Sequence, residues 1–253
     1  MDFNYGNLSS LTKRSNNNII KLVIYERKCF VPSSFISKFS NLQELEFSFD
    51  HYIEVLKILR HVIFPEFVIL KFKEECPKHE DLTIYLENYG KNLKVLHLGV
   101  NNDSLNLAIA KFCPNLKTLY MVFKDDEIDT LKIILNGCQQ LESIKVWCGD
   151  FYLNETELLE VVAKCSSKKF YELKIYFICR VYGPELEFFS EELEPVFVSW
   201  ADRIPQEPLS LIIVDCPTYI RVKKESIMVI EKFKKLGVIK KFEYFYSDKK
   251  KKE

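Results

Sequence analysis

Apolar residues recur along the chain in one short pattern, in which an apolar position is followed by two more, three and five residues later. The first apolar positions of the nine copies are Ile19, Leu42, Phe67, Leu93, Leu116, Leu141, Phe170, Leu209 and Ile239. The last two apolar positions of a copy are two residues apart, so they point to the same face of a short strand. Each copy therefore predicts a β-strand that is buried on one face.

Between these strands the apolar spacing becomes helical. In the segment 104–112, apolar residues return every three or four positions, as they do on one face of a helix. The segments 129–135 and 155–163 behave in the same way, and Asn154 is placed to cap the helix over 155–163. Each unit of the chain is therefore expected to run strand, turn, helix and return.

Successive copies begin 23, 25, 26, 23, 25, 29, 39 and 30 residues apart. The first five intervals lie in the range of roughly 20 to 29 residues that is typical of leucine-rich repeats. Neither the strand nor the helix of such a unit can bury its apolar face alone, so neighbouring units must stack. We therefore predict an α/β fold: a leucine-rich-repeat solenoid, shaped as an open horseshoe, with parallel strands on the concave face and helices on the convex face.

The repeat domain is expected to cover residues 18–246. A polar N-terminal segment over 1–17 precedes it, and a lysine-rich tail over 247–253 is expected to be disordered.

The rhythm of the repeats is interrupted between residues 178 and 208. Gly183-Pro184 breaks the chain, and residues 185–204 then predict an amphipathic acidic helix that Pro195 kinks or divides. We interpret this segment as a helical insertion in the seventh repeat.

Composition narrows the classes of function. Lys and Arg total 36, as do Asp and Glu, so the net charge is zero. Binding to nucleic acid or to an anionic membrane is driven by excess positive charge, so neither is expected. The N-terminus lacks the apolar segment of a signal peptide, and no apolar run reaches the roughly 18 residues that span a bilayer. We expect a cytoplasmic protein with reduced cysteines, and the run Lys249–Lys252 is also compatible with a nuclear address.

Cysteines stand at recurrent places around the strand pattern. Cys113 and Cys138 each lie three residues ahead of a first apolar position. Four more follow such a position by seven to nine residues: Cys76, Cys148, Cys179 and Cys216. This arrangement resembles the cysteine-containing class of leucine-rich repeat found in F-box/leucine-rich-repeat proteins, and the chain is similar in style to the large F-box-like families of some fungi.

The resemblance implies the substrate receptor of an SCF-type ubiquitin ligase. In that family an F-box binds the cullin-linked adaptor, and the repeats hold a protein target for proteasomal degradation. The residues ahead of Ile19 contain no Leu-Pro-x-Glu-type helix. We therefore expect the F-box itself to be absent: it has been lost, the gene model is truncated, or the protein works without the adaptor. Only target binding is carried over to this chain, and adaptor binding is expected only if a fuller chain contains an F-box. The alternative is a stand-alone leucine-rich-repeat scaffold or regulator with no link to a ubiquitin ligase.

Residues between the buried apolar positions are expected to face the open side of the sheet. They line up across neighbouring strands about 4.8 Å apart. The centre of these columns is basic and aromatic: Lys71, Lys73, His97, Tyr120, Lys145, Trp147, Lys174 and Tyr176. In the eighth copy the columns are expected to contain Ile213 and Asp215. Because Tyr and Trp are enriched at interface hot spots, we hypothesise that this patch binds an acidic segment of a protein partner. The alternative is that its lysines merely solvate an exposed sheet.

Other candidate chemistry is weaker. Cys76 and His79 have the spacing of half a zinc site, but no second pair is nearby, so no metal is expected. His97 beside Tyr120 is compatible with general acid–base catalysis, but the sequence places no nucleophile and no pair of carboxylates near these two residues. Glycine-rich phosphate loops and the common hydrolase motifs are missing. We expect a binding protein that is not an enzyme and carries no cofactor.

Overall fold

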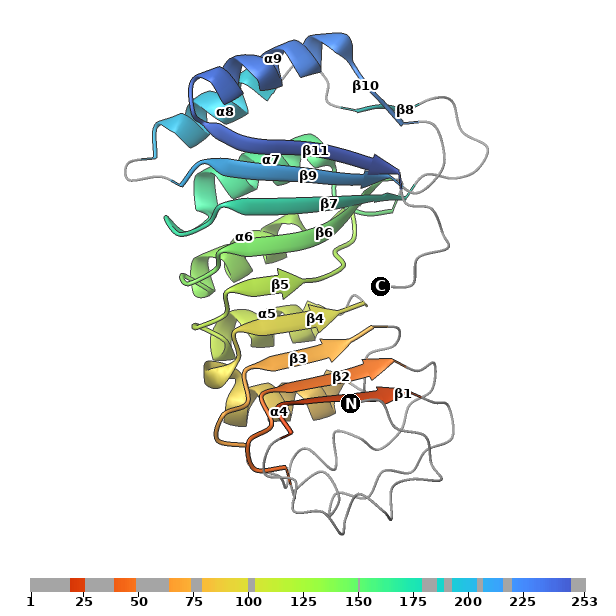
Figure 1. The fold of residues 1–253 in the computed structure, drawn as a ribbon, viewed down its shortest axis with the longest axis vertical. Helices are drawn as coiled ribbons and strands as arrows, with labels where there is room; N and C mark the ends of the chain where they lie inside the picture. Colours follow the sequence, from red (N-terminus) through yellow and green to blue (C-terminus); the bar gives the residue numbers. More distant parts are fainter. Residues whose placement is uncertain are drawn as a thin grey trace. The chain divides into compact units, whose positions relative to one another are not determined.

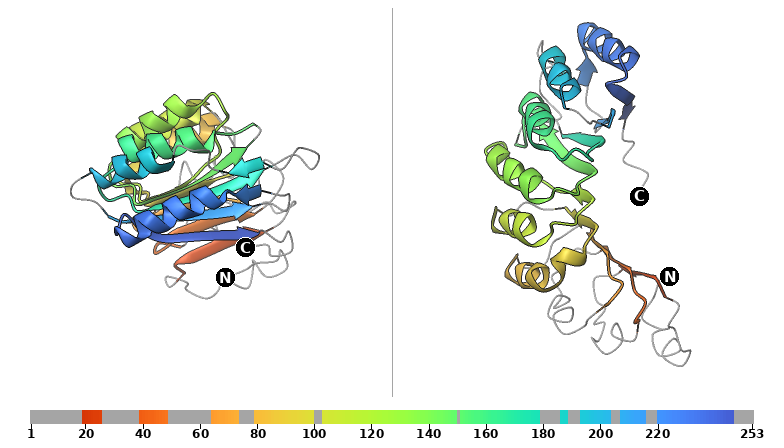
Figure 2. Two further views of the ribbon diagram at one scale, coloured as in Figure 1. Left: turned by 90° about the horizontal axis from the view of Figure 1, so that it is seen from above. Right: turned by 90° about the vertical axis from the view of Figure 1, so that its left-hand side faces the viewer.

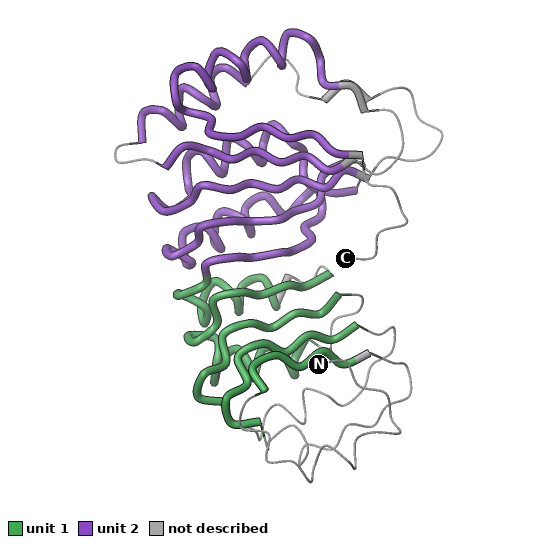
Figure 3. Tube along the Cα trace, viewed as in Figure 1, with its two compact units in different colours: residues 1–116 green, residues 117–253 purple. Residues whose placement is uncertain are grey.

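The computed structural model describes residues 19–25, 39–48, 64–73, 79–99, 103–149, 151–178, 186–188, 193–203, 207–215 and 220–246. The chain divides into two compact units, unit 1 (residues 1–116) and unit 2 (residues 117–253), which Figure 3 shows in different colours. Expectations for residues 1–17, for the tail over 247–253 and for Cys76 fall outside the described residues.

Unit 1 combines parallel strands with helices (Figure 1). Its described strands, which pair in chain order, are β1 (Lys21–Tyr25), β2 (Glu44–Ser48), β3 (Ile69–Phe72) and β4 (Val95–Leu98). Its described helices are α4 (His79–Tyr89), the short 3-10 helix η2 (Gly90–Asn92) and α5 (Asp103–Phe112).

Unit 2 repeats this arrangement with longer strands. Its main sheet contains, in order, β5 (Thr118–Tyr120), β6 (Ser143–Gly149), β7 (Glu172–Ile178), β9 (Leu209–Asp215) and β11 (Ile239–Tyr246). Its described helices are α6 (Ile128–Gly137), α7 (Glu155–Cys165), α8 (Leu193–Ala201) and α9 (Lys224–Lys235). The short strands β8 (Leu186–Phe188) and β10 (Ile220–Val222) form a second, parallel pair. Within each unit the described helices lie on one face of the sheet (Figure 2).

The core lies between the strands and the helices, and in the six copies that begin at Leu42 to Phe170 it occupies the positions that the sequence pattern marks. Each of the nine copies coincides with a described strand, four in unit 1 and five in the main sheet of unit 2. In the copy that begins at Leu141, the residues Leu141, Ile144 and Val146 are all fully buried. Burying one such side chain contributes roughly 1.5–3 kcal/mol. The prediction of an α/β fold with parallel strands is therefore confirmed.

The helices also begin where local chemistry favours them. The Asn154 side chain accepts hydrogen bonds from the backbone N–H groups of Thr156 (2.9 Å) and Glu157 (3.2 Å), as predicted for the cap of α7. This satisfies two of the four N–H groups that a helix start leaves without an internal partner.

The prediction for the eighth copy is wrong by one residue. Ile213, expected on the open side with Asp215, is fully buried and pairs across the sheet with the buried Ile175. The open side of β9 instead carries Ile212 and Val214. The cause is a run of four consecutive apolar residues in this strand, which fits the pattern in two registers. A slip of one residue turns every side chain of a strand to the other face.

The segment expected to form one helix over 185–204 is divided differently. Residues 186–188 form strand β8, and α8 begins only at Leu193. Pro195 lies in the first turn of α8, where its missing N–H costs nothing, so the predicted kink is wrong. Because α8 packs against both α7 and α9, it is the ordinary helix of the seventh unit, and the additional part is the segment that carries β8.

Arg203, two residues after the end of α8, links α8 to the preceding helix, α7, by hydrogen bonds. Its guanidinium donates hydrogen bonds to the carbonyl oxygens of Ser166, Ser167 (2.9 Å) and Val162 (3.4 Å) at the C-terminal end of α7. It also lies over the Trp200 ring, 4.6 Å from the centroid. Burial lowers the pKa of Arg203, but its cationic form suits the negative end of the helix dipole.

Candidate partner-binding surface

The open face of unit 2, opposite its described helices, is organised in rows that cross the strands. Strand register places Trp147 beside Tyr176, Tyr176 beside Val214, and Val214 beside Phe245. We call these four residues the Trp147 row. With parallel strands about 4.8 Å apart, the row extends for about 14 Å.

A second row runs beside the first, two residues earlier along each strand. This Lys174 row consists of Tyr120, Lys145, Lys174, Ile212 and Glu243. The sequence-predicted residues of unit 2 all belong to these two rows, and the structure brings them together. Sequence reasoning missed Ile212 and Val214, because it placed β9 in the wrong register.

The rings at the start of the two rows hold one another in place. The Trp147 indole Nε1–H donates a hydrogen bond to the Tyr120 hydroxyl oxygen at 2.9 Å. The ring centroids of Trp147 and Tyr176 are 5.0 Å apart, and those of Tyr120 and Tyr176 are 5.8 Å apart with the rings nearly perpendicular at 83°. Such aromatic pairs contribute about 0.5–1.5 kcal/mol beyond the area that they bury. All three residues are half-buried, so they form an ordered surface that is still accessible.

Tyr152 completes this cluster from the loop after β6. Gly149 ends the strand with φ of 125°, a conformation that other residues adopt only with strain. Its carbonyl oxygen accepts a hydrogen bond from the Tyr152 N–H at 2.9 Å, which turns the chain back. The Tyr152 ring then lies 6.4 Å from that of Trp147. Sequence reasoning missed Tyr152, although a glycine directly after the strand pattern signals such a turn.

The packing of the rings limits what the cluster can bind. A cation held by an aromatic cage lies within about 6 Å of several ring centroids, with the rings arranged around it. Here the rings of Trp147 and Tyr176 contact each other, so they form a packed platform with no space for a cation between them.

Lys174 adds a positive charge to the platform. Its Nζ lies 5.1 Å from the centroid of the Tyr176 ring, a cation–π contact that contributes about 0.5–1 kcal/mol at an exposed site. In the part of the chain that the structure describes, Lys174 makes no ion pair. Glu172 lies two residues away on the same strand face, so the local excess of positive charge is small.

The three predicted site residues of unit 1 lie in a different environment. Lys71 pairs with Glu44 at 2.8 Å, and Lys73 pairs with Glu46 at 2.8 Å. Lys21 on β1 approaches both glutamates, at 3.0 and 3.7 Å. Glu46 is only 4% exposed. The charges of Lys71 and Lys73 are thus balanced by the neighbouring strand. The partner of Lys71 was missed because the column that contains Glu44 was not considered, whereas Glu46 stands in the same column as Lys71 but pairs with Lys73.

This ion-paired network shifts the ionisation of its members. Partial burial acts to raise the pKa of Glu44, but hydrogen bonds from Lys71 and Lys21 outweigh it, and the pKa is lowered. The hydrogen bond to Glu44 raises the pKa of Lys21. His97 on β4 lies opposite Lys71 in the register and is half-buried.

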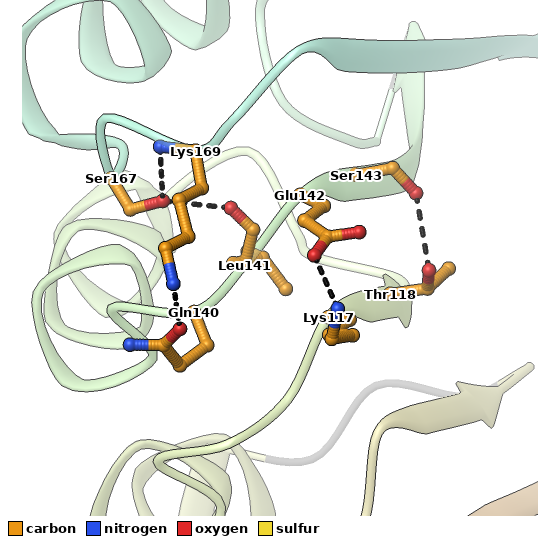
Figure 4. Close-up of polar contacts among 8 residues, drawn as sticks. All are labelled: Lys117, Thr118, Gln140, Leu141, Glu142, Ser143, Ser167 and Lys169. Carbon is orange, nitrogen blue, oxygen red and sulfur yellow. Dashed lines mark hydrogen bonds and ion pairs between the residues drawn. The ribbon is translucent and has the colours of Figure 1, made fainter.

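Contacts at the starts of the unit 2 strands fix the register on which the rows depend (Figure 4). Lys117 pairs with Glu142 of the next repeat at 2.6 Å. The Ser167 hydroxyl donates a hydrogen bond to the Leu141 carbonyl oxygen at 2.8 Å, again joining neighbouring repeats. We assign these residues a structural role, because each links one strand start to the next.

The described residues provide little evidence for a metal site or for a reactive cysteine thiol. No group of three or more His, Cys, Asp and Glu side chains there could hold a metal ion. His79 pairs with Glu80 at 3.2 Å. Burial raises the pKa of Cys138 to about 12 and that of Cys148 well above its usual value, so both thiols stay protonated in the core.

Comparisons with protein-family models and with curated proteins give no match that bears on this surface. No protein-family model matches the chain, and no curated protein matches it. Among its described helices, none is long and apolar enough to cross a membrane.

Proposed function

We propose that the chain is a protein-recognition module that holds its partner on the open face of unit 2. One observation carries this proposal: Tyr120, Trp147 and Tyr176 are half-buried on the face without helices, and their own contacts hold them in fixed orientations. Tyr and Trp are enriched among the residues that dominate binding energy. Rings that are already ordered lose little conformational entropy on binding.

Core packing is the competing account of these rings, and the ends of the rows argue against it. The core of unit 2 lies on the other side of the strands, at fully buried residues such as Ile144 and Val146. Phe245, at the end of the Trp147 row, is 47% exposed. A row that continues to an exposed phenylalanine is better suited to an interface than to the core.

For the role of the bound partner we follow the resemblance to F-box/leucine-rich-repeat proteins. We propose that the chain is the substrate-recognition part of an SCF-type ubiquitin ligase receptor, and that the partner is marked for proteasomal degradation. Two features support this: stacked strand–helix repeats, and the buried Cys113 and Cys138 at the positions typical of the cysteine-containing class. The second candidate is a stand-alone scaffold, because the resemblance assigns adaptor binding to none of the described residues.

Affinity capture of the full chain, followed by mass spectrometry, tests both levels of the proposal. We expect specific partners to be lost when Trp147→Ala and Tyr176→Ala are combined. Met228→Ala, which changes a 60% exposed side chain on α9, should retain them. Thermal unfolding must show that each variant is folded. Partners that persist on the double variant would contradict the proposed surface.

The same experiment separates the two candidate roles. Adaptor and cullin in the eluate of the wild-type chain support the ligase receptor. Reproducible partners without adaptor or cullin support the stand-alone scaffold.

A further inference from the structure

The open face of unit 2 is polarised from β6 to β11. Over β6 and β7 the Lys174 row contains two lysines, Lys145 and Lys174. Over β9 and β11 the two rows contain the apolar residues Ile212, Val214 and Phe245, of which Val214 is largely buried, and Glu243. The face therefore carries lysines and aromatic rings at one end and mainly apolar side chains at the other.

Ion pairs increase the difference between the two ends of this face. At the β11 end, Glu243 pairs with Lys241 at 2.8 Å, so its charge is compensated within the strand. At the β7 end, Lys174 makes no ion pair with any described residue, and its amine is held over the Tyr176 ring. The amine of Lys174 is thus positioned to receive a carboxylate from outside the chain.

We propose that this face takes an extended peptide segment that carries a carboxylate side chain about four positions from a large apolar side chain. The carboxylate lies at Lys174, and the apolar side chain packs against the exposed Phe245. This inference rests on the proposed function and specifies the chemistry of the partner.

The spacing follows from the order of the strands. From β7 to β11 there are two strand steps, through β9, which together measure about 10 Å. An extended chain advances about 3.3 Å per residue. The position opposite Lys174 on β11 is Glu243, and Phe245 lies two residues further along that strand, so Lys174 and Phe245 are about 12 Å apart. Alternate side chains of an extended segment face the same side, so a segment that crosses the strands places its two anchoring side chains about four residues apart.

Anionic lipid surfaces and nucleic acids fit this face less well. Their binding depends on several unpaired cations and weakens steeply with salt. On the open face of unit 2, Glu172 lies on the same strand face as Lys174, and Glu243 pairs with Lys241. Carboxylates thus lie among the lysines, which disfavours a polyanion more than a single carboxylate.

A random-peptide display library, selected on the immobilised full chain, tests the inference. We expect enriched sequences to contain Asp or Glu about four positions from Leu, Ile, Phe or Trp. Selection on Lys174→Glu should replace the acidic preference with a basic one, and selection on Phe245→Ser should remove the apolar preference. Lys235→Glu and Leu236→Ser, which change exposed positions at the end of α9, are the matched controls and should leave the preference unchanged.

The affinity of a synthetic peptide with the enriched sequence shows how strongly binding depends on the position of the acidic residue. Moving its acidic residue by one position should weaken binding to the wild-type chain about tenfold, since a charge-assisted hydrogen bond is lost. Equal affinity for the two peptides would overturn the proposed spacing.

The remaining outcomes distinguish this inference from the proposed function. Enriched peptides that need Trp147 and Tyr176 but lack the acidic–apolar spacing overturn the inference and leave the proposed function standing. Peptides that bind equally well to the Trp147→Ala/Tyr176→Ala variant overturn the proposed function itself. Failure to enrich any sequence also overturns the inference, because an extended segment should then have been selected.

Discussion

The two units use the same buried pattern but fill the open positions of their strands in opposite ways. In unit 1, Glu46 is almost completely buried and forms an ion pair with Lys73, so charges on this strand face are paired within the chain. In unit 2, the equivalent positions hold Tyr120 and Trp147, which bond to each other, and the cation of Lys174 has no ion-pair partner among the described residues. The buried residues therefore determine the fold, while the residues between them determine whether the charges of a face are paired within the chain.

The largest expected effect tests the register of β9, on which the unit 2 rows depend. Ile213→Asp places a carboxylate in the core and should destabilise the chain by about 4 kcal/mol or more. Ile212→Asp changes the open face and should cost less than about 1 kcal/mol. Thermal and urea unfolding of both variants measure the difference. Equal losses would contradict the register that we describe.

The next largest effect concerns the ring cluster of unit 2. Trp147→Ala removes contacts with Tyr120, Tyr152 and Tyr176, and should cost about 2–3 kcal/mol, less than for a fully buried tryptophan. Tyr120→Phe keeps the ring but removes the acceptor of the indole hydrogen bond, and should cost about 1 kcal/mol. Urea unfolding measures both. If Tyr120→Phe is as stable as the wild type, the hydrogen bond does not order the platform.

A smaller effect is expected from the ion-paired face of unit 1. Glu46→Gln leaves Lys21 and Lys73 without that counter-charge and should cost about 1–2 kcal/mol, because both lysines remain partly exposed. Both tryptophans of the chain, Trp147 and Trp200, belong to unit 2. Their fluorescence thus follows unit 2, whereas circular dichroism follows the whole chain. A destabilisation visible by dichroism alone would show that the units unfold separately.

The smallest effect is the pH dependence of the ion-paired face of unit 1. The pKa of Glu44 is lowered on folding, so its contribution to stability is present above its usual pKa and is lost as the pH falls through the folded pKa. The pKa of Lys21 is raised, so its contribution is present below its usual pKa and is lost as the pH rises through the folded pKa. Between about pH 7 and pH 3, hydrogen exchange in β2 and β3, corrected for intrinsic rates, should accelerate a few-fold more than in β6 and β7. Equal acceleration in both units would contradict this.

The sequence was sufficient for those parts of the fold that local periodicity encodes. The buried positions Leu141, Ile144 and Val146 and the Asn154 cap follow from spacing and chemistry within a few residues. The pairing of β8 with β10 joins residues more than thirty positions apart and leaves no periodic signal. The register of β9 was ambiguous because its apolar run fits the pattern twice, and only packing against Ile175 decides between the two.

The candidate site was predictable to a similar degree. Trp147, Tyr176 and Lys174 were found because each occupies a fixed place in its repeat. The balancing role of Glu44 was missed because it depends on the neighbouring strand, and a lysine column alone suggests free charge. Tyr152 was missed because its loop returns to the strand, which depends on the backbone conformation of Gly149.

The rows of unit 2 make its open face modular. Each row takes one residue from each repeat, so exchanging a single repeat replaces one contact in every row and leaves the buried pattern intact. The aromatic cluster is the exception, because the hydrogen bond from Trp147 to Tyr120 and the ring contacts of both with Tyr176 join side chains of three repeats. On the proposed function, binding preferences could therefore change one repeat at a time over β9 and β11, whereas the repeats of β5, β6 and β7 must change together.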